Sequence, residues 1–485
     1  MQKQTRNMPS KKLVTLLETL SGHDLNRFRK FLASPYFNES KELEILLDWI
    51  ATEHSKKENS EDSLAAKQAI WKKIFGKKPY NDGHMRRLIS ELIRHILDFL
   101  ALEYYRKDPI QEQILLLDIL NEPAYALPFA GVLRQAEALQ EKSGLQNSKY
   151  HYFQYRIEEY VYQYIEKTDR NPEMLNKLES ADFHLDCYYI IQKLRHYCDI
   201  LGYHNFLSTQ MTVQLPANFL TWIEENKYLE APAVHIYFLI TKMLLSPEDE
   251  SFFLELKNLL LTKEKLFQKP ELKSFYVHLL NYCIDKKINL GKPDFFYELF
   301  DIFKTVLDRE ILLENGLINP QDYKNIITVG LQVKEFSWVE NFIQTYTEKL
   351  PPEEQENAKI YNLAKVYFQQ NQYNKVIELL REVEYQNHTY ALGGKLMLLK
   401  TYYELNEYLA LDSLIDSFRI YLRRNKMISK EVRQQYMNVL RFVKKLSKVM
   451  PGDKDVIAKI RREIDNCNAL ADKNWILQKI AELEG

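Results

Sequence analysis

Glycine is scarce in this chain. The 485 residues contain only 13 glycines, roughly 3%, whereas average usage is about 7%. Tight β-hairpin turns and phosphate-binding loops both depend on glycine, because a side chain would block their backbone conformations. No stretch of alternating Val, Ile or Thr bounded by an Asn-Gly or Asp-Gly turn stands out, so the sequence predicts no strands. A glycine-poor chain rich in Leu, Lys, Glu and Gln is expected to be all-α.

The motifs of common enzyme classes are also missing. The chain contains no GxxxxGK[ST], no GxGxxG after a strand, no HExxH and no GxSxG. His184, Cys187, His196 and Cys198 look like a set of metal ligands in one dimension. A single helix would, however, separate the two histidines by about 18 Å, too far to share one zinc ion. We therefore predict no catalytic residues, no cofactor and no metal site, and hence a protein that is not an enzyme.

Disulfide frameworks and long apolar runs are absent as well. The four cysteines are scattered along helical patterns, which favours a reducing compartment. The N-terminal apolar stretch is short and interrupted by Thr and Glu, so it makes a poor signal peptide. The longest apolar run, around 234–245, is broken by Lys242 and is too short to span a bilayer. The sequence predicts a cytoplasmic protein with no membrane partner.

Charge is nearly balanced overall but unevenly distributed. Residues 1–107 carry 20 Lys and Arg against 14 Asp and Glu, residues 108–418 carry 30 against 45, and residues 419–462 carry 14 against 3. Such basic ends can hold phosphates or an acidic protein surface. They can equally be solvated faces balanced by the acidic middle of the same or a second molecule. The candidate basic patch at the C-terminal end comprises Arg423, Arg424, Arg441, Lys445 and Lys448.

A second group of cations lies around an expected helix–loop–helix near the N-terminus. It comprises Lys72, Lys73, Lys77, Lys78, Arg86, Arg87 and Arg94. A helix that follows a short loop and bears Arg near its start could enter a DNA major groove. Apolar residues surround much of 85–105, however, which favours burial of that helix between neighbours. A DNA-reading role is therefore the less favoured interpretation.

Helix-start and helix-end signals divide the chain into helix pairs. Asn319-Pro320-Gln321-Asp322 is a typical start: a capping side chain, Pro in the first turn, then an acid. Gly202 follows an apolar run and predicts a helix end. We expect a basic helical module over 1–107, an irregular helical segment over 108–231, and regular helix hairpins over 232–485. The hairpins are predicted at 232–245 with 247–262, 270–286 with 293–309, 320–334 with 337–349, 354–370 with 373–385, 390–405 with 408–424, and 429–449 with 453–482.

Two stretches repeat each other about 35 residues apart. They are LAKVYFQQNQYNKVIELL from Leu363 and LLKTYYELNEYLALDSLI from Leu398. Each contains an apolar helix, an aromatic pair, an Asn-centred turn, a Tyr and a second apolar helix. This unit resembles a tetratricopeptide repeat. The matching positions are Leu363, Ala364, Tyr367, Asn371, Tyr373, Val376, Leu380 and Val383, then Leu398, Leu399, Tyr402, Asn406, Tyr408, Leu411, Ile415 and Phe418, with a weaker copy at Ile326, Gly330, Phe336, Val339, Ile343 and Tyr346.

The chain departs from the family pattern where paired helices pack. Ile360 stands in place of the family's Trp, Ala364 and Leu399 stand in place of a Gly, and Val376 and Leu411 stand in place of an Ala. Bulkier side chains at these positions are expected to widen the helix crossing and to change the curvature of the array. The family's carboxylate-clamp pattern is not reproduced, so the resemblance does not imply a ligand that ends in a free carboxylate.

The resemblance implies a right-handed superhelical array of antiparallel helix hairpins that binds a peptide on the concave face, which the first helices line. Its candidate partner-binding residues are Tyr361, Lys365, Phe368, Lys400 and Tyr403. A Lys and an aromatic recur one turn apart in both units, which offers a cation beside a ring. Solvated lysines and packing rings would give the same pattern.

We predict a non-enzymatic scaffold that binds a protein or peptide partner on this concave face. The alternative is a nucleic-acid-associated regulator that uses its basic N-terminal and C-terminal segments while the array senses a partner. Self-association, with a basic end against the acidic middle, is a third interpretation of the same charge pattern.

Overall fold

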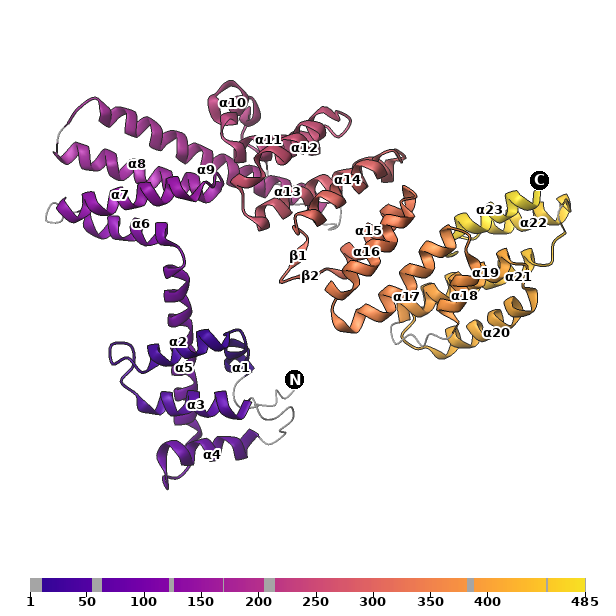
Figure 1. The fold of residues 1–485 in the computed structure, drawn as a ribbon, viewed down its shortest axis with the longest axis horizontal. Coiled ribbons are helices and arrows are strands. Elements are labelled where there is room, and N and C mark those ends of the chain that lie inside the picture. The colour runs from indigo at the N-terminus through magenta and orange to yellow at the C-terminus, as the bar shows by residue number, and fades with distance from the viewer. Residues whose placement is uncertain are drawn as a thin grey trace. The chain divides into compact units, whose positions relative to one another are not determined.

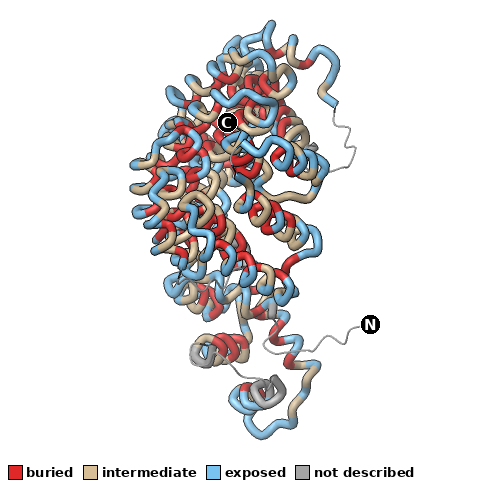
Figure 2. Tube along the Cα trace, turned by 90° about the vertical axis from the view of Figure 1, so that its right-hand side faces the viewer, coloured by how far each residue is buried: buried red, intermediate tan, exposed pale blue. Residues whose placement is uncertain are grey.

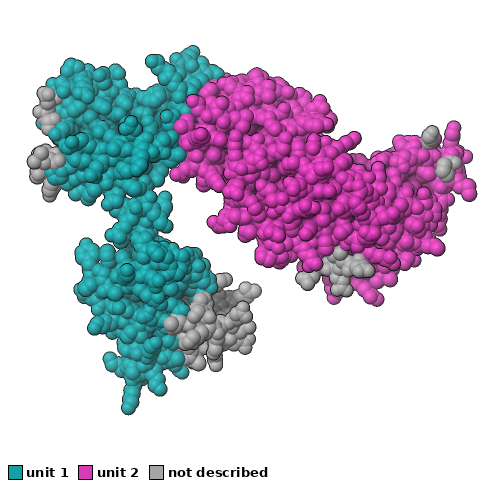
Figure 3. All heavy atoms as spheres, in the orientation of Figure 1, with its two compact units in different colours: residues 1–193, 221–234 teal, residues 194–220, 235–485 magenta. Residues whose placement is uncertain are grey.

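The chain is almost entirely helical. The computed structural model describes residues 11–54, 63–121, 126–168, 170–204, 214–381, 388–450 and 452–484. These residues form 23 α-helices and one two-stranded ribbon (Figure 1), so the predicted all-α class is confirmed. The chain divides into two compact units, residues 1–193 with 221–234 and residues 194–220 with 235–485 (Figure 3). The predicted domain boundaries at 107/108 and 231/232 stay predictions.

Five helices in the N-terminal part share one apolar core. They are α1 (Lys11–Glu18), α2 (Gly22–Leu32), α3 (Lys41–His54), α4 (Ser63–Phe75) and α5 (Asp82–Arg106). Leu88, Leu92, Ile96 and Phe99 of α5 are buried at helical spacing, and α5 contacts α1, α2 and α3. The Asn81 side chain starts α5 by accepting a hydrogen bond from the backbone N–H of His84. The predicted burial of much of α5 is therefore confirmed.

The next helices have a core of their own. They are α6 (Pro109–Leu120), α7 (Ala126–Ser143) and α8 (Ser148–Thr168), packed around Ile114, Leu117, Phe129, Phe153 and Ile157. The long α9 (Glu173–His204) follows, then α10 (Phe219–Glu225). The helix end predicted at Gly202 is wrong, because α9 continues through it. The cost of about 1 kcal/mol for a helical glycine is evidently smaller than the gain from the surrounding turns.

Helices in close succession fill the rest of the chain. They are α11 (Pro232–Leu245), α12 (Ser251–Lys263), α13 (Lys269–Asn281), α14 (Phe295–Asp308), α15 (Pro320–Gln332), α16 (Phe336–Tyr346), α17 (Pro352–Gln369), α18 (Tyr373–Leu380), α19 (His388–Glu404), α20 (Tyr408–Arg424), α21 (Lys430–Leu446), α22 (Lys454–Asp465) and α23 (Lys473–Glu484). Neighbours in sequence are also neighbours in space: α17 contacts α18, α18 contacts α19, and α17 also contacts α19. Buried residues line the faces that helices turn toward one another (Figure 2).

Two further predictions about secondary structure are wrong. A short antiparallel ribbon joins β1 (Leu313–Glu314) to β2 (Leu317–Ile318). Its turn is Asn315-Gly316, with φ of 52° and 81°, the left-handed conformations that a tight hairpin turn requires. The single helix predicted at 453–482 is two helices, α22 and α23, separated by an Asn-containing turn in which Asp472 has φ of 49°.

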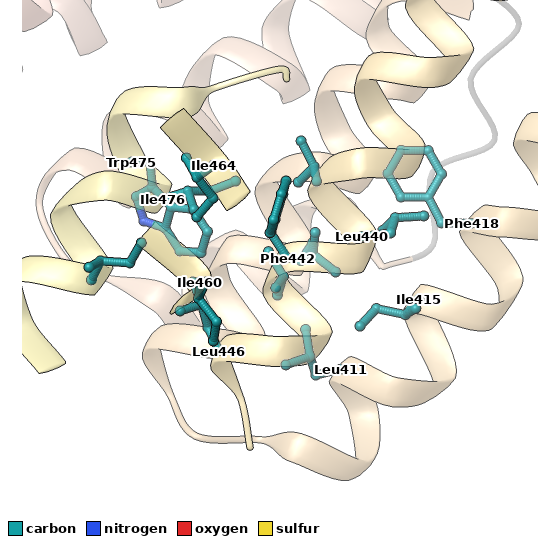
Figure 4. Close-up of a cluster of buried hydrophobic side chains, with 14 of the residues drawn as sticks. Leu411, Ile415, Phe418, Leu440, Phe442, Leu446, Ile460, Ile464, Trp475 and Ile476 are labelled. Atoms are coloured by element: carbon teal, nitrogen blue, oxygen red, sulfur yellow. The ribbon is translucent and has the colours of Figure 1, made fainter. Parts of the chain in front are cut away.

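The last four helices share the C-terminal core. Leu411, Ile415 and Phe418 project from α20 toward Leu440, Phe442 and Leu446 of α21 (Figure 4). Ile460 and Ile464 of α22 and Trp475 and Ile476 of α23 complete the cluster. The 3–4 spacing of apolar residues in 429–449 predicts a buried stripe of Val432, Tyr436, Val439, Leu440, Val443 and Leu446. The last four are buried, and Val432 and Tyr436 are half-buried. Burial of so many large apolar side chains holds α23 firmly in place.

Candidate functional site

Three successive turns set the positions of the first helices. Lys334, Asn371 and Asn406 each follow a first helix and adopt the left-handed conformation, with φ of 61°, 58° and 58°. The next residue in each turn donates its N–H to a carbonyl near the end of the first helix, over 2.8–2.9 Å, as in a Schellman motif. In the last two turns a Tyr hydroxyl, from Tyr373 or Tyr408, donates to the Asn side chain. The sequence repeat thus corresponds to a repeated local structure.

A cavity of about 210 Å³ lies where α17 and α19 meet α21 and the residue before α23. It brings together Tyr361, Lys365, Phe368 and Lys400, four of the five predicted partner-binding residues. We call it the α17–α19 groove. Its other lining residues are Gln369, Gly393, Leu396, Met397, Tyr436 and Asp472. Val383, a matched repeat position, lies outside the described residues.

Close approach of two helices forms one wall of the groove. A Cβ at Gly393 would lie 2.6 Å from the Tyr361 hydroxyl oxygen and 2.8 Å from the nearest carbons of that ring. Only glycine therefore lets the Tyr361 ring lie against α19. The ring also meets Tyr390 edge-on, with centroids 5.5 Å apart. Burial raises the pKa of Tyr361 to about 12, so its hydroxyl remains a neutral hydrogen-bonding group.

Lys400 is already engaged within the chain. Its Nζ lies 2.7 Å from Oδ2 of Asp472, and its side chain is only 16% exposed. The same ammonium lies 4.8 Å from the centroid of the Phe368 ring and 5.3 Å from that of Trp475. An ion pair and two aromatic faces hold this cation in place. Lys400 is thus mainly a fixed part of the groove wall, and not the free cation that the sequence suggested.

Lys365 has a different environment. Its Nζ lies 3.5 Å from the Thr328 hydroxyl oxygen, and no described carboxylate forms an ion pair with it. Burial, and then the positive charge of Lys324, lower the pKa of the Lys365 amine. Lys324 itself lies over the Tyr390 ring, 4.9 Å from its centroid. Two lysines without an acidic partner among the described residues thus lie close together, an arrangement that an anion would stabilise.

The C-terminal helix closes the groove on one side. Trp475 Nε1 donates to Glu404 over 2.9 Å, and Lys479 Nζ donates to the other oxygen of the same carboxylate over 2.8 Å. A second cavity of about 560 Å³ lies between α23 and the ends of α15, α17 and α19. It shares Phe368, Gln369, Lys400 and Asp472 with the α17–α19 groove. The two spaces are therefore parts of one continuous surface.

Tyr403 does not line either space. Its ring packs edge-on against Trp475, with centroids 5.5 Å apart, and it lies against the C-terminal core. Sequence reasoning missed Asp472, Trp475 and Lys479 because α23 was read as the continuation of α22. The signal that could have found them is the polar stretch Asn466-Cys467-Asn468, which interrupts the apolar spacing.

The predicted C-terminal basic patch is partly neutralised. Arg423, Arg424 and Lys448 are exposed, and the Arg441 guanidinium lies 4.5 Å from the centroid of the Phe442 ring. Lys445, by contrast, pairs with Glu463 of α22. These five residues are therefore not equivalent: between described residues only Lys445 forms an ion pair, and Arg441 lies near enough to Glu463 for its charge to act on that carboxyl.

Neighbouring cations of the same segment also have partners. Lys444 pairs with Asp412 over 3.4 Å, and Arg461 pairs with Glu484 over 2.5 Å. Arg433 donates to the carbonyls of Leu422, Asn425 and Ile428 and so closes the end of α20. Of the cations in 419–462, Arg433, Lys444, Lys445 and Arg461 therefore join neighbouring helices.

In the α9 region Cys187 and Cys198 are buried, His184 is half-buried and His196 is exposed. His184 lies beside His151, with their Nδ1 atoms 2.9 Å apart, and burial raises the pKa of both Cys187 and Cys198 to about 12. Across the described ranges, no three His, Cys, Asp or Glu side chains are grouped as metal ligands would be. No described helix is long and apolar enough to cross a bilayer.

Comparisons with known proteins give no relatives. No family model, no curated protein and no solved structure matches the chain.

Proposed function

We propose that this chain is a non-enzymatic scaffold that binds an acidic segment of a partner protein or peptide in the α17–α19 groove. The observation that carries the proposal is Lys365. Its ammonium lies in a cavity beside Tyr361 and Phe368, is close to a second lysine, and has no acidic partner among the described residues. A carboxylate from outside the chain would satisfy this charge, and the rings would hold an apolar neighbour of that carboxylate.

The proposed scaffold has the architecture that the resemblance implies, a right-handed superhelical array of tetratricopeptide-like hairpins. Side-chain bonds between successive layers support it. Lys149–Asp108, Lys257–Glu298 and Lys273–Glu314 each join residues 41 apart in the chain. Others join residues 33 to 38 apart, as in Arg309–Tyr276, Lys287–Glu250 and Arg156–Asp118. Separations of roughly one hairpin are expected when each hairpin stacks on the one before it.

The spacing changes at α23. Trp475 and Lys479 reach Glu404 across 71 and 75 residues, and Lys400 reaches Asp472 across 72. In the proposed scaffold α23 folds back over the end of α19 and borders the groove. A partner segment in the groove would then contact both α17 and α23.

A selection from a random peptide library tests the proposal, with the full-length chain as bait and Lys365→Glu as the counter-selected variant. We expect the enriched peptides to carry Asp or Glu next to an aromatic or aliphatic residue. Binding of these peptides should be lost in Lys365→Glu and retained in Lys263→Glu, an equally charged change at an exposed position on α12. Enrichment without acidic residues, or equal binding by both variants, would contradict the proposal.

A second variant separates shape from charge. Gly393→Ala places a methyl group against the Tyr361 ring, which must then move into the groove. We expect this variant to keep the helical content of the chain and to weaken the selected peptides. Unchanged affinity with a displaced ring would show that the peptides bind elsewhere.

A further inference from the structure

The hairpin formed by α4 and α5 is held rigid by a cluster of aromatic side chains. Trp71 is only 6% exposed, and its Nε1 donates to the carbonyl of Lys78 over 2.9 Å. The Phe75 ring lies 4.2 Å from that of Trp71, and Tyr80 packs edge-on at 5.6 Å. His84 contacts both Trp71 and Phe75. The turn between the helices therefore has one fixed shape.

This hairpin carries a dense group of exposed cations. They are Lys72 and Lys73 at the end of α4, Lys77 and Lys78 in the turn, and Arg86, Arg87 and Arg94 on α5. Arg86 pairs with Asp82, and Glu42 lies near enough to Lys78 for the lysine charge to act on its carboxyl. No ion pair is found for the other five in the part of the chain that the structure describes. We call this set the α4–α5 basic surface.

The cations on α5 share one face of the helix. Gly83, Arg86, Arg87, Ser90 and Arg94 are all exposed and recur at intervals of three to four residues. Arg87 and Arg94 are separated by about 10 Å along the axis, at 1.5 Å per residue. Duplex DNA carries one phosphate charge per roughly 1.7 Å of its length. A face of this extent can therefore contact several phosphates at once.

We propose that the α4–α5 basic surface binds the phosphate backbone of double-stranded DNA without regard to base sequence. This role does not depend on the peptide groove. It gives the chain a second partner, so that the scaffold would bring its protein ligand to DNA.

Two features favour DNA over an acidic protein or an anionic membrane. No large hydrophobic side chain is exposed between residues 68 and 94, and Leu97, one turn after Arg94, is 45% exposed. A single apolar side chain offers little area to insert among lipid chains. Protein interfaces usually contain buried aromatic or aliphatic anchors and are depleted in lysine, whereas four of the seven cations here are lysines. Phosphate binding requires only exposed cations on a rigid frame.

The test uses the full-length chain and a fluorescently labelled duplex DNA of random sequence. Fluorescence anisotropy is measured over a series of NaCl concentrations. We expect binding at low salt that weakens steeply as salt rises. The variant Lys77→Glu with Arg87→Glu should bind at least ten-fold more weakly and show a smaller salt slope, by about 0.9 for each phosphate that the variant no longer neutralises.

A matched control is available on α12 and just after it. Lys263→Glu with Lys265→Glu alters the net charge by the same amount at exposed positions and should leave DNA binding unchanged. Lys72→Gln with Lys73→Gln, a milder pair on the same surface, should give a smaller loss and guards against misfolding of the first variant. Absence of binding at low salt, or equal loss in the α12 control, would overturn the proposal. Binding to anionic phospholipid vesicles in place of DNA would overturn it as well.

Discussion

The two basic regions of this chain use their charges differently. In the C-terminal segment 419–462, Lys444, Lys445 and Arg461 pair with acids of neighbouring helices. On the α4–α5 hairpin, seven cations are exposed and Arg86 alone has an ion pair among the described residues. The C-terminal segment has the larger net charge in the sequence, yet several of its cations join neighbouring helices, whereas the one ion pair of the hairpin cations lies within α5. The net charge of a segment therefore does not show how much of it is available to a partner.

Breaking a deeply buried ion pair of the C-terminal helices should give the largest effect on stability. Lys479 is 7% exposed and Glu404 is 15% exposed at the side chain. Lys479→Met leaves the Glu404 carboxylate without its main cation, and we expect the free energy of unfolding to fall by about 3 kcal/mol. Urea denaturation followed by Trp fluorescence measures this loss.

Two further variants sharpen that result. Glu404→Gln combined with Lys479→Met removes both charges and should recover part of the stability. Lys77→Met, on the exposed hairpin, should change the free energy of unfolding by less than about 0.5 kcal/mol. Similar losses in Lys479→Met and Lys77→Met would refute the claim that buried, paired lysines of the C-terminal helices stabilise the fold and exposed hairpin lysines do not.

Acidification should act on the histidine pair His151 and His184, where burial outweighs the charge of the nearby Glu158 carboxylate. Burial lowers the pKa of His151 to about 3 and also lowers the pKa of His184. Both histidines titrate near 6.5 when unfolded, so their contribution to stability is complete above pH 6.5 and is lost as the pH falls below it. For His151 we expect a loss that approaches about 1.4 kcal/mol per pH unit below pH 6.5, and His184 should add to this loss in the same direction.

Hydrogen exchange locates that loss. Amide protection in α8 and α9 should decrease between pH 7 and pH 5, while protection in α21 should change much less. His151→Phe should remove part of the pH dependence. Equal decreases in α8 and α21 would show that another group is responsible.

Replacement of Lys365, the groove lysine without an ion pair to a described residue, should stabilise the chain modestly. Lys365→Met eliminates a partly buried ammonium whose pKa is lowered by burial, and we expect a gain of about 1 kcal/mol at pH 7. Because the unfolded lysine holds its proton to higher pH, the wild type itself gains stability as the pH rises toward 10.5. The advantage of Lys365→Met should therefore shrink at high pH. Thermal melts at pH 7 and pH 10 measure it, and a destabilised variant at pH 7 would contradict the assignment.

The exposed ion pairs of the C-terminal region should have the smallest effects. Lys445→Gln removes a pair whose side chains are 40% and 32% exposed, and we expect a loss of about 0.5 kcal/mol. Arg423→Gln, which breaks no ion pair between described residues, should cost less. Denaturation in low and high salt separates the two, because only the first loss should decrease with added salt.

Local structure could be predicted well where the sequence repeats itself. The turns at Asn371 and Asn406 are left-handed helix caps, which depend only on neighbouring residues. The buried stripe of α21 follows from the helical spacing of its apolar residues. The same reasoning placed Tyr361, Lys365, Phe368 and Lys400 on neighbouring first helices, and the structure brings these four side chains to one cavity.

Long-range contacts could not be predicted in the same way. The pairing of Lys400 with Asp472 and the packing of Tyr403 on Trp475 join residues about 72 positions apart. No local pattern encodes such contacts. The prediction of a single helix over 453–482 also left out the separate helix α23, which carries Trp475. The lack of ion pairs at most of the α4–α5 cations could not be predicted either, because sequence alone does not show which acids lie near them in the fold.

The location of a bound peptide tests the central claim most directly. A peptide from the library selection, carrying a photo-crosslinking group next to its acidic residue, is irradiated with the full-length chain and the adduct is mapped by mass spectrometry. We predict adducts on Phe368, Leu396 or Met397, in the α17–α19 groove, and none in Lys365→Glu. Adducts confined to α20–α22 or to the N-terminal helices, in wild type and variant alike, would contradict the claim.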